Sequence, residues 1–376
     1  MLFTPARINT LEVPNRFVRS ATYDGGAEPG GIVSDWQMEL YRALAQGGVG
    51  LIVSGIFHVT KDGRISPVQN GLFDDRFIPG LTRLAQAAHA QGAKLAVQLF
   101  HAGRETHRWK QYKGETASGP SALAEGQDPY FAGACLAMGE DDIWATVEAF
   151  GQAARRAKEA GCDGVQLHGA HAYLLAQFLS PQANRRQDAW GGGLEGRLRL
   201  HQEIYHAVRQ QVGPDFPVMI KLGLADGFAG GLELAEGLEA ASRLAALGFD
   251  AIEVSQGLRG AHYAETEFRD RIVKREREGY FRGWARQVKQ HVAVPVMAVG
   301  GYRSLDLIQE VVASGDADFV ALSRPLIREP DLVASWRAGE ERRPTCISCN
   351  KCFENLLTGA RLRCMVPMKG EALNRQ

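Results

Sequence analysis

Three polar side chains follow one short apolar run near the middle of the chain. His168 ends that run, and His171 and Tyr173 come within the next five residues. Two imidazole N–H groups aimed at one spot can polarise a carbonyl oxygen, and a tyrosine hydroxyl beside them can donate a proton. The spacing also suits plain packing or a metal pair, although an obvious third ligand is lacking nearby. Because so short a motif favours packing when taken alone, its place in the fold has to decide.

Four of the six cysteines crowd into the last 31 residues of the sequence. Separated by two, two and eleven residues, they are Cys346, Cys349, Cys352 and Cys364. This spacing fits a tetrahedral sulfur site or a [4Fe–4S] cluster. Spacing identifies thiolate ligation better than it identifies the metal. Three interpretations therefore stay open, namely a cluster, a zinc ion and a set of reduced thiols.

The overall composition excludes several functional classes. The chain has 376 residues with 43 basic and 43 acidic side chains, whereas a nucleic-acid-binding protein needs an excess of Lys and Arg. Its hydrophobic fraction of 45% is too high for a disordered chain. Six cysteines in so long a chain do not indicate a disulfide framework.

No segment has the pattern of a secretory signal or a membrane span. The first ten residues lack a long apolar stretch behind a basic start. The longest apolar run, residues 49–57, is broken by Gly50, Ser54 and Gly55 and is far shorter than the roughly 20 residues of a span. We therefore expect a cytoplasmic protein with no membrane and no nucleic-acid partner.

Eight short apolar runs alternate with longer segments of helical pattern, such as residues 148–160 and 234–247. The runs are nearly continuous, as expected of parallel strands that are buried on both faces. The predicted strands cover residues 16–21, 49–55, 93–99, 164–168, 217–223, 251–255, 295–299 and 319–323. Eight β-then-α units predict an α/β fold, a closed (β/α)₈ TIM barrel over residues 1–341, because a doubly wound sheet would leave the eighth unit unexplained. Residues 342–376 are then a cysteine-bearing C-terminal extension.

The barrel gives the polar motif its place. Active sites of such barrels lie at the C-terminal ends of the strands. His168 ends the fourth predicted strand, and the long segment 100–140 follows the third strand at the same end. This position moves the interpretation of His168, His171 and Tyr173 from packing towards catalysis.

Five segments, in order along the chain, carry a resemblance to a known family. They are LFTPARINTLEVPNRFVRSAT at residues 2–22, VQLFHAGR at 97–104, HGAHAYLLAQFLSPQANRRQDAWGGGLEGRLR at 168–199, VGG at 299–301 and ALSRP at 321–325. With them the sequence resembles the old yellow enzyme family, the FMN-dependent ene-reductases among the NADH:flavin oxidoreductases, whose first segment forms an N-terminal hairpin. The cysteine segment is similar to the cluster-binding segment of the family's larger members, 2,4-dienoyl-CoA reductase and trimethylamine dehydrogenase.

The resemblance implies an FMN site at the open end of the barrel. Gln98 would hydrogen-bond the polar edge of the flavin pyrimidine, since an amide both donates and accepts. Lys221, where the family usually has Arg, would place a cation near flavin N1 and O2 and stabilise the reduced state. The other implied contacts are with the flavin ring, from Ala21, Thr22 and Gly55, and with the phosphate, from Gly300, Gly301, Ser323 and Arg324.

The implied reaction uses NADH or NADPH to reduce the flavin and a small activated alkene to reoxidise it. The carbonyl or nitro oxygen of the alkene would lie between His168 and His171, while Tyr173 would protonate the α-carbon. No Gly-x-Gly-x-x-Gly fingerprint follows a strand, so a Rossmann domain is not expected. The natural alkene, the choice between NADH and NADPH, and the oligomeric state, a homo-oligomer included, stay open.

Three rival functions stay open on the same residues. The same flavin scaffold supports oxidative amine demethylation. A flavin-free barrel lyase would use Lys221 to form a Schiff base. An FMN electron-transfer module would carry electrons without turning over alkenes.

The larger relatives raise a question about electron supply. They continue into FAD- and nucleotide-binding domains, whereas this chain stops 12 residues after Cys364. A working cluster is therefore expected to exchange electrons with a separate electron-transfer partner.

Overall fold

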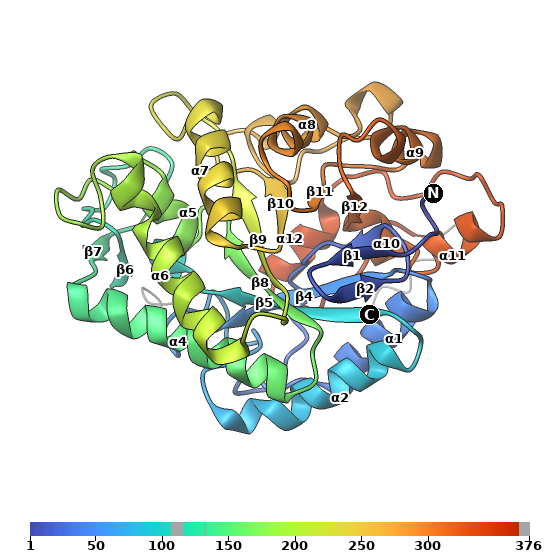
Figure 1. Ribbon diagram of the computed structural model, residues 1–376, viewed down its shortest axis with the longest axis horizontal. Coiled ribbons are helices and arrows are strands. Elements are labelled where there is room, and N and C mark those ends of the chain that lie inside the picture. The colour runs from blue at the N-terminus through green and yellow to red at the C-terminus, as the bar shows by residue number, and fades with distance from the viewer. Residues whose placement is uncertain (107–115, 132, 368–376) are drawn as a thin grey trace.

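The computed structural model describes residues 1–106, 116–131 and 133–367. Its centre is a closed barrel of eight parallel strands with helices around it (Figure 1). The strands are β3 (Phe17–Arg19), β4 (Leu51–His58), β5 (Lys94–Phe100), β8 (Gly164–Gly169), β9 (Val218–Gly223), β10 (Ala251–Ser255), β11 (Val296–Ala298) and β12 (Phe319–Leu322). β12 pairs with β3 and so closes the ring. The predicted TIM barrel is thus confirmed, and no predicted strand end is displaced by more than three residues.

Helices cover the outside of the barrel. The longer ones are α1 (Asp35–Gln46), α2 (Ile78–His89), α4 (Glu140–Glu159), α6 (Leu194–Val212), α7 (Leu234–Leu247), α8 (Arg282–His291) and α9 (Leu305–Ala313). The short ones are α5 (Leu174–Leu179), α10 (Arg324–Arg328), α11 (Leu332–Arg337) and α12 (Lys351–Leu357), with 3₁₀ turns at Asp75–Phe77, Gly103–Thr106, Tyr263–Glu265 and Arg275–Arg277. α7 has its predicted bounds, whereas α4 begins eight residues before the predicted 148–160. Its extra turns start at Gly139, whose N–H donates to the Asp142 carboxylate. Within the described residues, none of the helices combines the length and the apolar character that a bilayer crossing needs.

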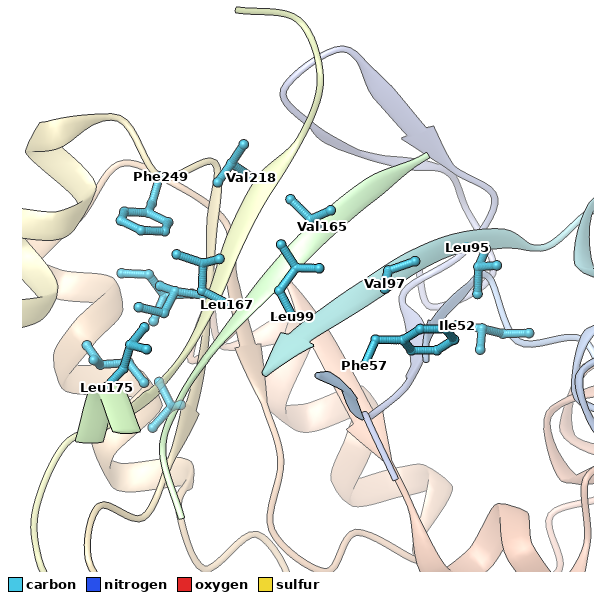
Figure 2. Close-up of a cluster of buried hydrophobic side chains, with 14 of the residues drawn as sticks. Ile52, Phe57, Leu95, Val97, Leu99, Val165, Leu167, Leu175, Val218 and Phe249 are labelled. Carbon is cyan, nitrogen blue, oxygen red and sulfur yellow. The ribbon is translucent and has the colours of Figure 1, made fainter. Parts of the chain in front are cut away.

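Strand side chains alternate between the helices and the inside of the barrel. Figure 2 shows Val97 and Leu99 of β5 and Leu167 of β8 in the apolar layer that faces the helices. Because neighbours on a strand point to opposite sides, Gln98 and His168 point into the barrel. Both side chains are buried there.

A hairpin closes the end of the barrel at which the strands begin. β1 (Ala6–Ile8) and β2 (Leu11–Val13) pair in antiparallel fashion. Ile8 and Val13 are fully buried against Leu51 and Phe319, which start β4 and β12. The predicted N-terminal hairpin is present, and the cavity that holds the predicted site residues opens at the opposite end of the barrel.

The residues after α11 pack on that open end. Nη1 of Arg324 donates to Oδ1 of Asn350 over 2.6 Å, and Nδ2 of Asn350 donates to the carbonyl of Phe268 over 2.7 Å. The N–H of Leu362 donates to the carbonyl of Asp24 over 2.8 Å. The cysteine segment is therefore attached to the barrel, while our division of the chain at residues 341 and 342 stays a prediction. A further pair of short strands, β6 (Ala117–Gly119) and β7 (Cys135–Ala137), lies in the long segment after β5.

Candidate active site

A cavity of about 220 Å³ opens at the C-terminal end of the barrel strands. Ten of the twelve predicted catalytic and flavin-binding residues line it, namely Ala21, Thr22, Gln98, His168, His171, Tyr173, Lys221, Gly301, Ser323 and Arg324. The remaining two lie beside it. A Cβ on Gly55 would come within 3.2 Å of the carbonyl oxygen of Thr22, and one on Gly300 would meet Tyr280 and Phe281. The residues that line the cavity come from all eight barrel strands or the turns that follow them.

A turn in the left-handed region brings the second histidine over the cavity. His171 and Ala172 have φ angles of 60° and 64°, which side-chain-bearing residues seldom adopt. The His171 N–H donates to the carbonyl of Gln256, which holds the turn against the loop that follows β10. The rings of His168 and His171 lie 4.9 Å apart and nearly perpendicular, and the Tyr173 ring lies 5.0 Å from that of His168. The predicted trio is thus brought together at one end of the cavity.

Both imidazoles are neutral near pH 7. Burial lowers the pKa of His168 well below 6.5, and the neighbouring His171 and Lys221 lower it further. Burial also lowers the pKa of His171, with Lys221 and Arg259 acting in the same direction. A neutral imidazole keeps one N–H donor and one acceptor nitrogen. Nε2 of His171 lies 2.7 Å from the hydroxyl of Ser255, whereas Nδ1 of the buried His168 has no partner among the described residues.

Tyr173 carries a protonated phenol. Burial raises its pKa above 10, although the guanidinium of Arg259 opposes the shift. Its ring packs edge-on against Phe100 at 4.5 Å, and the Arg259 guanidinium carbon lies 5.3 Å from the ring centre. Arg259 donates in turn to both carboxylate oxygens of Glu267, over 2.7 Å to Oε1 and 3.0 Å to Oε2. The phenol is therefore protonated, and its ring is held between Phe100 and Arg259.

The floor of the cavity is a buried polar network that our sequence analysis only partly identified. Gln98 and Lys221 were predicted, but their partners Gln166 and Glu253 were not. Both residues lie inside predicted strands that are otherwise largely apolar, and no role was assigned to either. Alternate residues of a strand face the inside of the barrel, and Gln166 and Glu253 occupy such positions, as Gln98 and His168 do. This alternation is the sequence signal that could have identified them.

The opposite end of the cavity suits a phosphate. Gly301 has a φ of 76°, and a Cβ there would come within 2.9 Å of the Tyr280 ring, so this position requires glycine. Without a side chain, its backbone is accessible from the cavity. Arg324 lines the cavity and is held there by Nη1, which donates to the carbonyl of Arg269 and to Asn350. Nε of Arg303, a second lining arginine that we had not predicted, is buried without a partner. The Nη groups of Arg303 donate to the carbonyls of Ile272 and Pro344, so its Nε–H is the donor left for a ligand. Arginines suit an anion with several acceptor oxygens.

The four clustered cysteines line one smaller cavity beside the first. Cys352 lines both cavities, so the two adjoin through it. All four are free, partly exposed thiols, and Nη1 of Arg328 donates to Sγ of Cys364 over 3.1 Å. Among the residues that the structure describes, no three His, Cys, Asp or Glu side chains converge on a single metal ion. The predicted metal site is therefore not confirmed.

The sequence is similar to proteins of one known family along most of its length. A sequence model described as the NADH:flavin oxidoreductase / NADH oxidase family matches residues 1–343. A metal reductase of Desulforamulus reducens is 35% identical over 97% of this chain and 53% of its own length. A 4,4'-dithiodibutanoate disulfide reductase of Rhodococcus erythropolis is 32% identical over 97% of this chain and 94% of its own length.

Among solved structures, a 2-naphthoyl-CoA reductase in complex with 2-naphthoyl-CoA is similar to this chain. The two superpose with a TM-score of 0.89 at 31% identity, over 97% of this chain and 56% of the other. This chain thus spans about half the length of the metal reductase and of the 2-naphthoyl-CoA reductase, and nearly the whole length of the disulfide reductase.

Proposed function

Because the chain belongs to the NADH:flavin oxidoreductase / NADH oxidase family, as its resemblance to the old yellow enzymes led us to expect, we propose that it reduces activated alkenes. NAD(P)H would be the reductant, FMN the bound cofactor and an α,β-unsaturated carbonyl compound the substrate. One observation carries the proposal. Two neutral imidazoles and a protonated tyrosine meet at one end of a cavity whose other end presents Arg324 and an Nε–H of Arg303 that has no partner.

The cavity can hold FMN along its length. Gln98 and Lys221 would face the pyrimidine edge, and the arginine-bearing end would take the phosphate, with Arg303 added to the predicted set. The remaining predicted contacts would come from Ala21, Thr22 and Gly55 at the ring and from Gly300, Gly301, Ser323 and Arg324 at the phosphate. Bound there, FMN supplies hydride transfer between NAD(P)H and the substrate.

The chain's own side chains supply the rest of the chemistry. His168 and His171 would donate N–H groups to the substrate oxygen, which stabilises the negative charge that develops there. Tyr173 would give its proton to the α-carbon and recover it from solvent. Because NAD(P)H and alkene would use one cavity in turn, ping-pong kinetics are expected.

The rival functions differ in what this site offers them. A Schiff base needs an amine that is free to attack a carbonyl, but Nζ of Lys221 is held 2.8 Å from the carboxylate of fully buried Glu253 and also donates to Ser20. The lyase is therefore the weakest rival. Amine demethylation needs no proton donor over an α-carbon, so it gives Tyr173 no catalytic role. Electron transfer alone would give His168 and His171 no catalytic role.

Anaerobic absorbance spectroscopy tests the proposal. We expect purified protein to be yellow, to lose its flavin absorbance when NADPH or NADH is added, and to regain it on addition of 2-cyclohexenone. Colourless protein would support the lyase. Flavin that is bleached by NAD(P)H but not reoxidised by enones or nitroalkenes would support the electron-transfer module, and flavin bleached by a tertiary amine would support demethylation.

Organic disulfides are the second candidate class of substrate. The relative named as a disulfide reductase matches this chain over 94% of its own length, unlike the two-fold longer relatives. Reoxidation by 4,4'-dithiodibutanoate faster than by any enone would assign the chain to that activity instead.

We propose that the cysteine segment binds a [4Fe–4S] cluster. A single zinc ion would need its thiolates within about 2.3 Å of one point. The described thiols line a common cavity without converging on one ion. In a four-iron cluster each cysteine binds a different iron, so the four sulfurs lie further apart.

Iron and acid-labile sulfide should accordingly be present in anaerobically purified protein. Cys349→Ser should lose most of both, because a cluster needs all four thiolates. Cys162→Ala, at a buried cysteine in the helix-facing core, should keep them. Zinc without sulfide in the wild-type protein would contradict the cluster.

A further inference from the structure

The buried network below the cavity is centred on Glu253 of β10. Its Oε1 accepts from the hydroxyl of Ser20 over 2.6 Å and lies 2.8 Å from Nζ of Lys221, which also donates to Ser20. Its Oε2 accepts from Nε2 of Gln166 over 2.9 Å. Every member is at least 98% buried. A carboxylate so deep in a protein persists only when it is paired and hydrogen-bonded, and here both of its oxygens are.

Glu253 also sets the direction of the hydrogen bonds on the other side of the network. A carboxylate only accepts, so Gln166 must turn its Nε2 towards Glu253 and its Oε1 away. That Oε1 accepts from Nε2 of Gln98 over 2.7 Å. The amide of Gln98 is therefore fixed with one N–H committed and its own Oε1 free. Glu253 thus holds both of the residues that face the pyrimidine edge, Lys221 directly and Gln98 through Gln166.

The network carries no net charge. The ammonium of Lys221 is the cation at the floor of the cavity, and its charge is cancelled by the carboxylate of Glu253 2.8 Å away. A cation near the pyrimidine stabilises the more negative, reduced flavin. A cation that is paired in this way does so less strongly than an unpaired one.

We propose that Glu253 is a positioning residue that orients Lys221 and Gln98 and lowers the reduction potential of the bound FMN. The inference rests on the proposed binding of FMN. It adds a carboxylate on β10 as the group that decides how much of the Lys221 charge the flavin experiences.

Potentiometry of the FMN-loaded protein tests the role. In an anaerobic spectroelectrochemical titration, Glu253→Gln should raise the two-electron midpoint potential by at least about 30 mV, equivalent to a tenfold gain in preference for reduced flavin. Glu253→Asp keeps the charge and should stay near the wild-type potential. Asp128→Asn is the matched control, because Asp128 forms a buried ion pair with Arg104 at 2.9 Å but does not line the cavity. Its potential should equal that of the wild type.

A second pair of variants covers the case in which Glu253→Gln does not retain FMN. Lys221→Gln leaves the carboxylate unpaired and should lower the potential. Adding Glu253→Gln to it restores a neutral floor and should return the potential towards the wild-type value.

The outcomes separate the inference from the function on which it rests. A wild-type protein that binds no FMN removes both. Wild-type protein that binds FMN, combined with a Glu253→Gln potential that is unchanged or lower, overturns the role of Glu253 alone. An equal rise in Glu253→Asp and Glu253→Gln would likewise overturn it, since packing rather than charge would then be responsible.

Discussion

Tyr173→Phe should slow the reduction of an enone by about 10²- to 10⁴-fold, the usual contribution of a positioned general acid. The substitution removes only the hydroxyl, so the ring contacts with Phe100 and His168 are retained. Reduction of the flavin by NADPH needs no proton from this phenol and should be nearly unchanged. Stopped-flow absorbance measures the two half-reactions separately, which makes the contrast between them the decisive quantity.

Tyr23→Phe is the matched control for that experiment. Tyr23 lines the same cavity, and burial raises its pKa to about 12, so it is also a protonated phenol. It packs with Tyr173 in one apolar cluster, but Tyr173 alone has its ring 5.0 Å from His168. A large loss in Tyr23→Phe with little effect of Tyr173→Phe would reassign the donor. Equal losses in both half-reactions of Tyr173→Phe would contradict a proton-donor role altogether.

The barrel was predictable because each parallel strand that is buried on both faces appears in the sequence as a short, nearly continuous apolar run. Their apolar runs can be counted, and eight of them have few arrangements other than a closed ring. The start of α4 was not predictable in the same way. Glu140, Asp141 and Asp142 form its first turn, and such residues occur equally in loops, so the helix becomes recognisable only at its apolar positions further along.

The residues of the site were predictable where they form a recognisable pattern of residue types. They were not predictable where the site depends on backbone dihedral angles or on which side of a strand a residue faces. The positive φ angles of the turn after β8 fall on His171 and Ala172, residue types that give no sign of a left-handed backbone. Gln166 and Glu253 are hidden within apolar runs, and only the alternation of a strand places them inside the barrel. Arg259 and Glu267 reach Tyr173 from a loop with no recognisable motif, as contacts between distant segments often do.

The charges around the histidine pair explain why such hidden partners matter. Burial and the cations Lys221 and Arg259 all lower the pKa of His171, and without them a protonated imidazole would become easier to form. The site therefore depends on cations that are themselves balanced, Lys221 by Glu253 and Arg259 by Glu267. Neutral N–H donors can stabilise the negative charge that develops on the substrate oxygen. Because the neighbouring cations are each paired with a carboxylate, they add little attraction for other anions.

Removing either imidazole should lower kcat/KM for the enone by about 10²- to 10³-fold, the typical cost of losing one donor to a developing oxyanion. His171→Ala should show the full loss, whereas His171→Asn keeps an N–H donor and should lose less. His201→Gln is the control, because His201 is buried on α6 away from the cavity and burial lowers its pKa to about 3, so it is also a neutral histidine. Its kcat/KM should stay at the wild-type value.

The pH dependence of the same rate distinguishes neutral donors from charged ones. The pKa values of His168 and His171 lie well below 6.5, so both rings stay neutral as the pH rises from 6 to 8. Since the pKa of Tyr173 lies above 10, its proton also stays in place over that range. The alkene half-reaction should therefore show no inflection between pH 6 and 8. A rate that falls as the pH rises through about 6.5, the ordinary value for histidine, would show instead that an imidazolium binds the substrate oxygen.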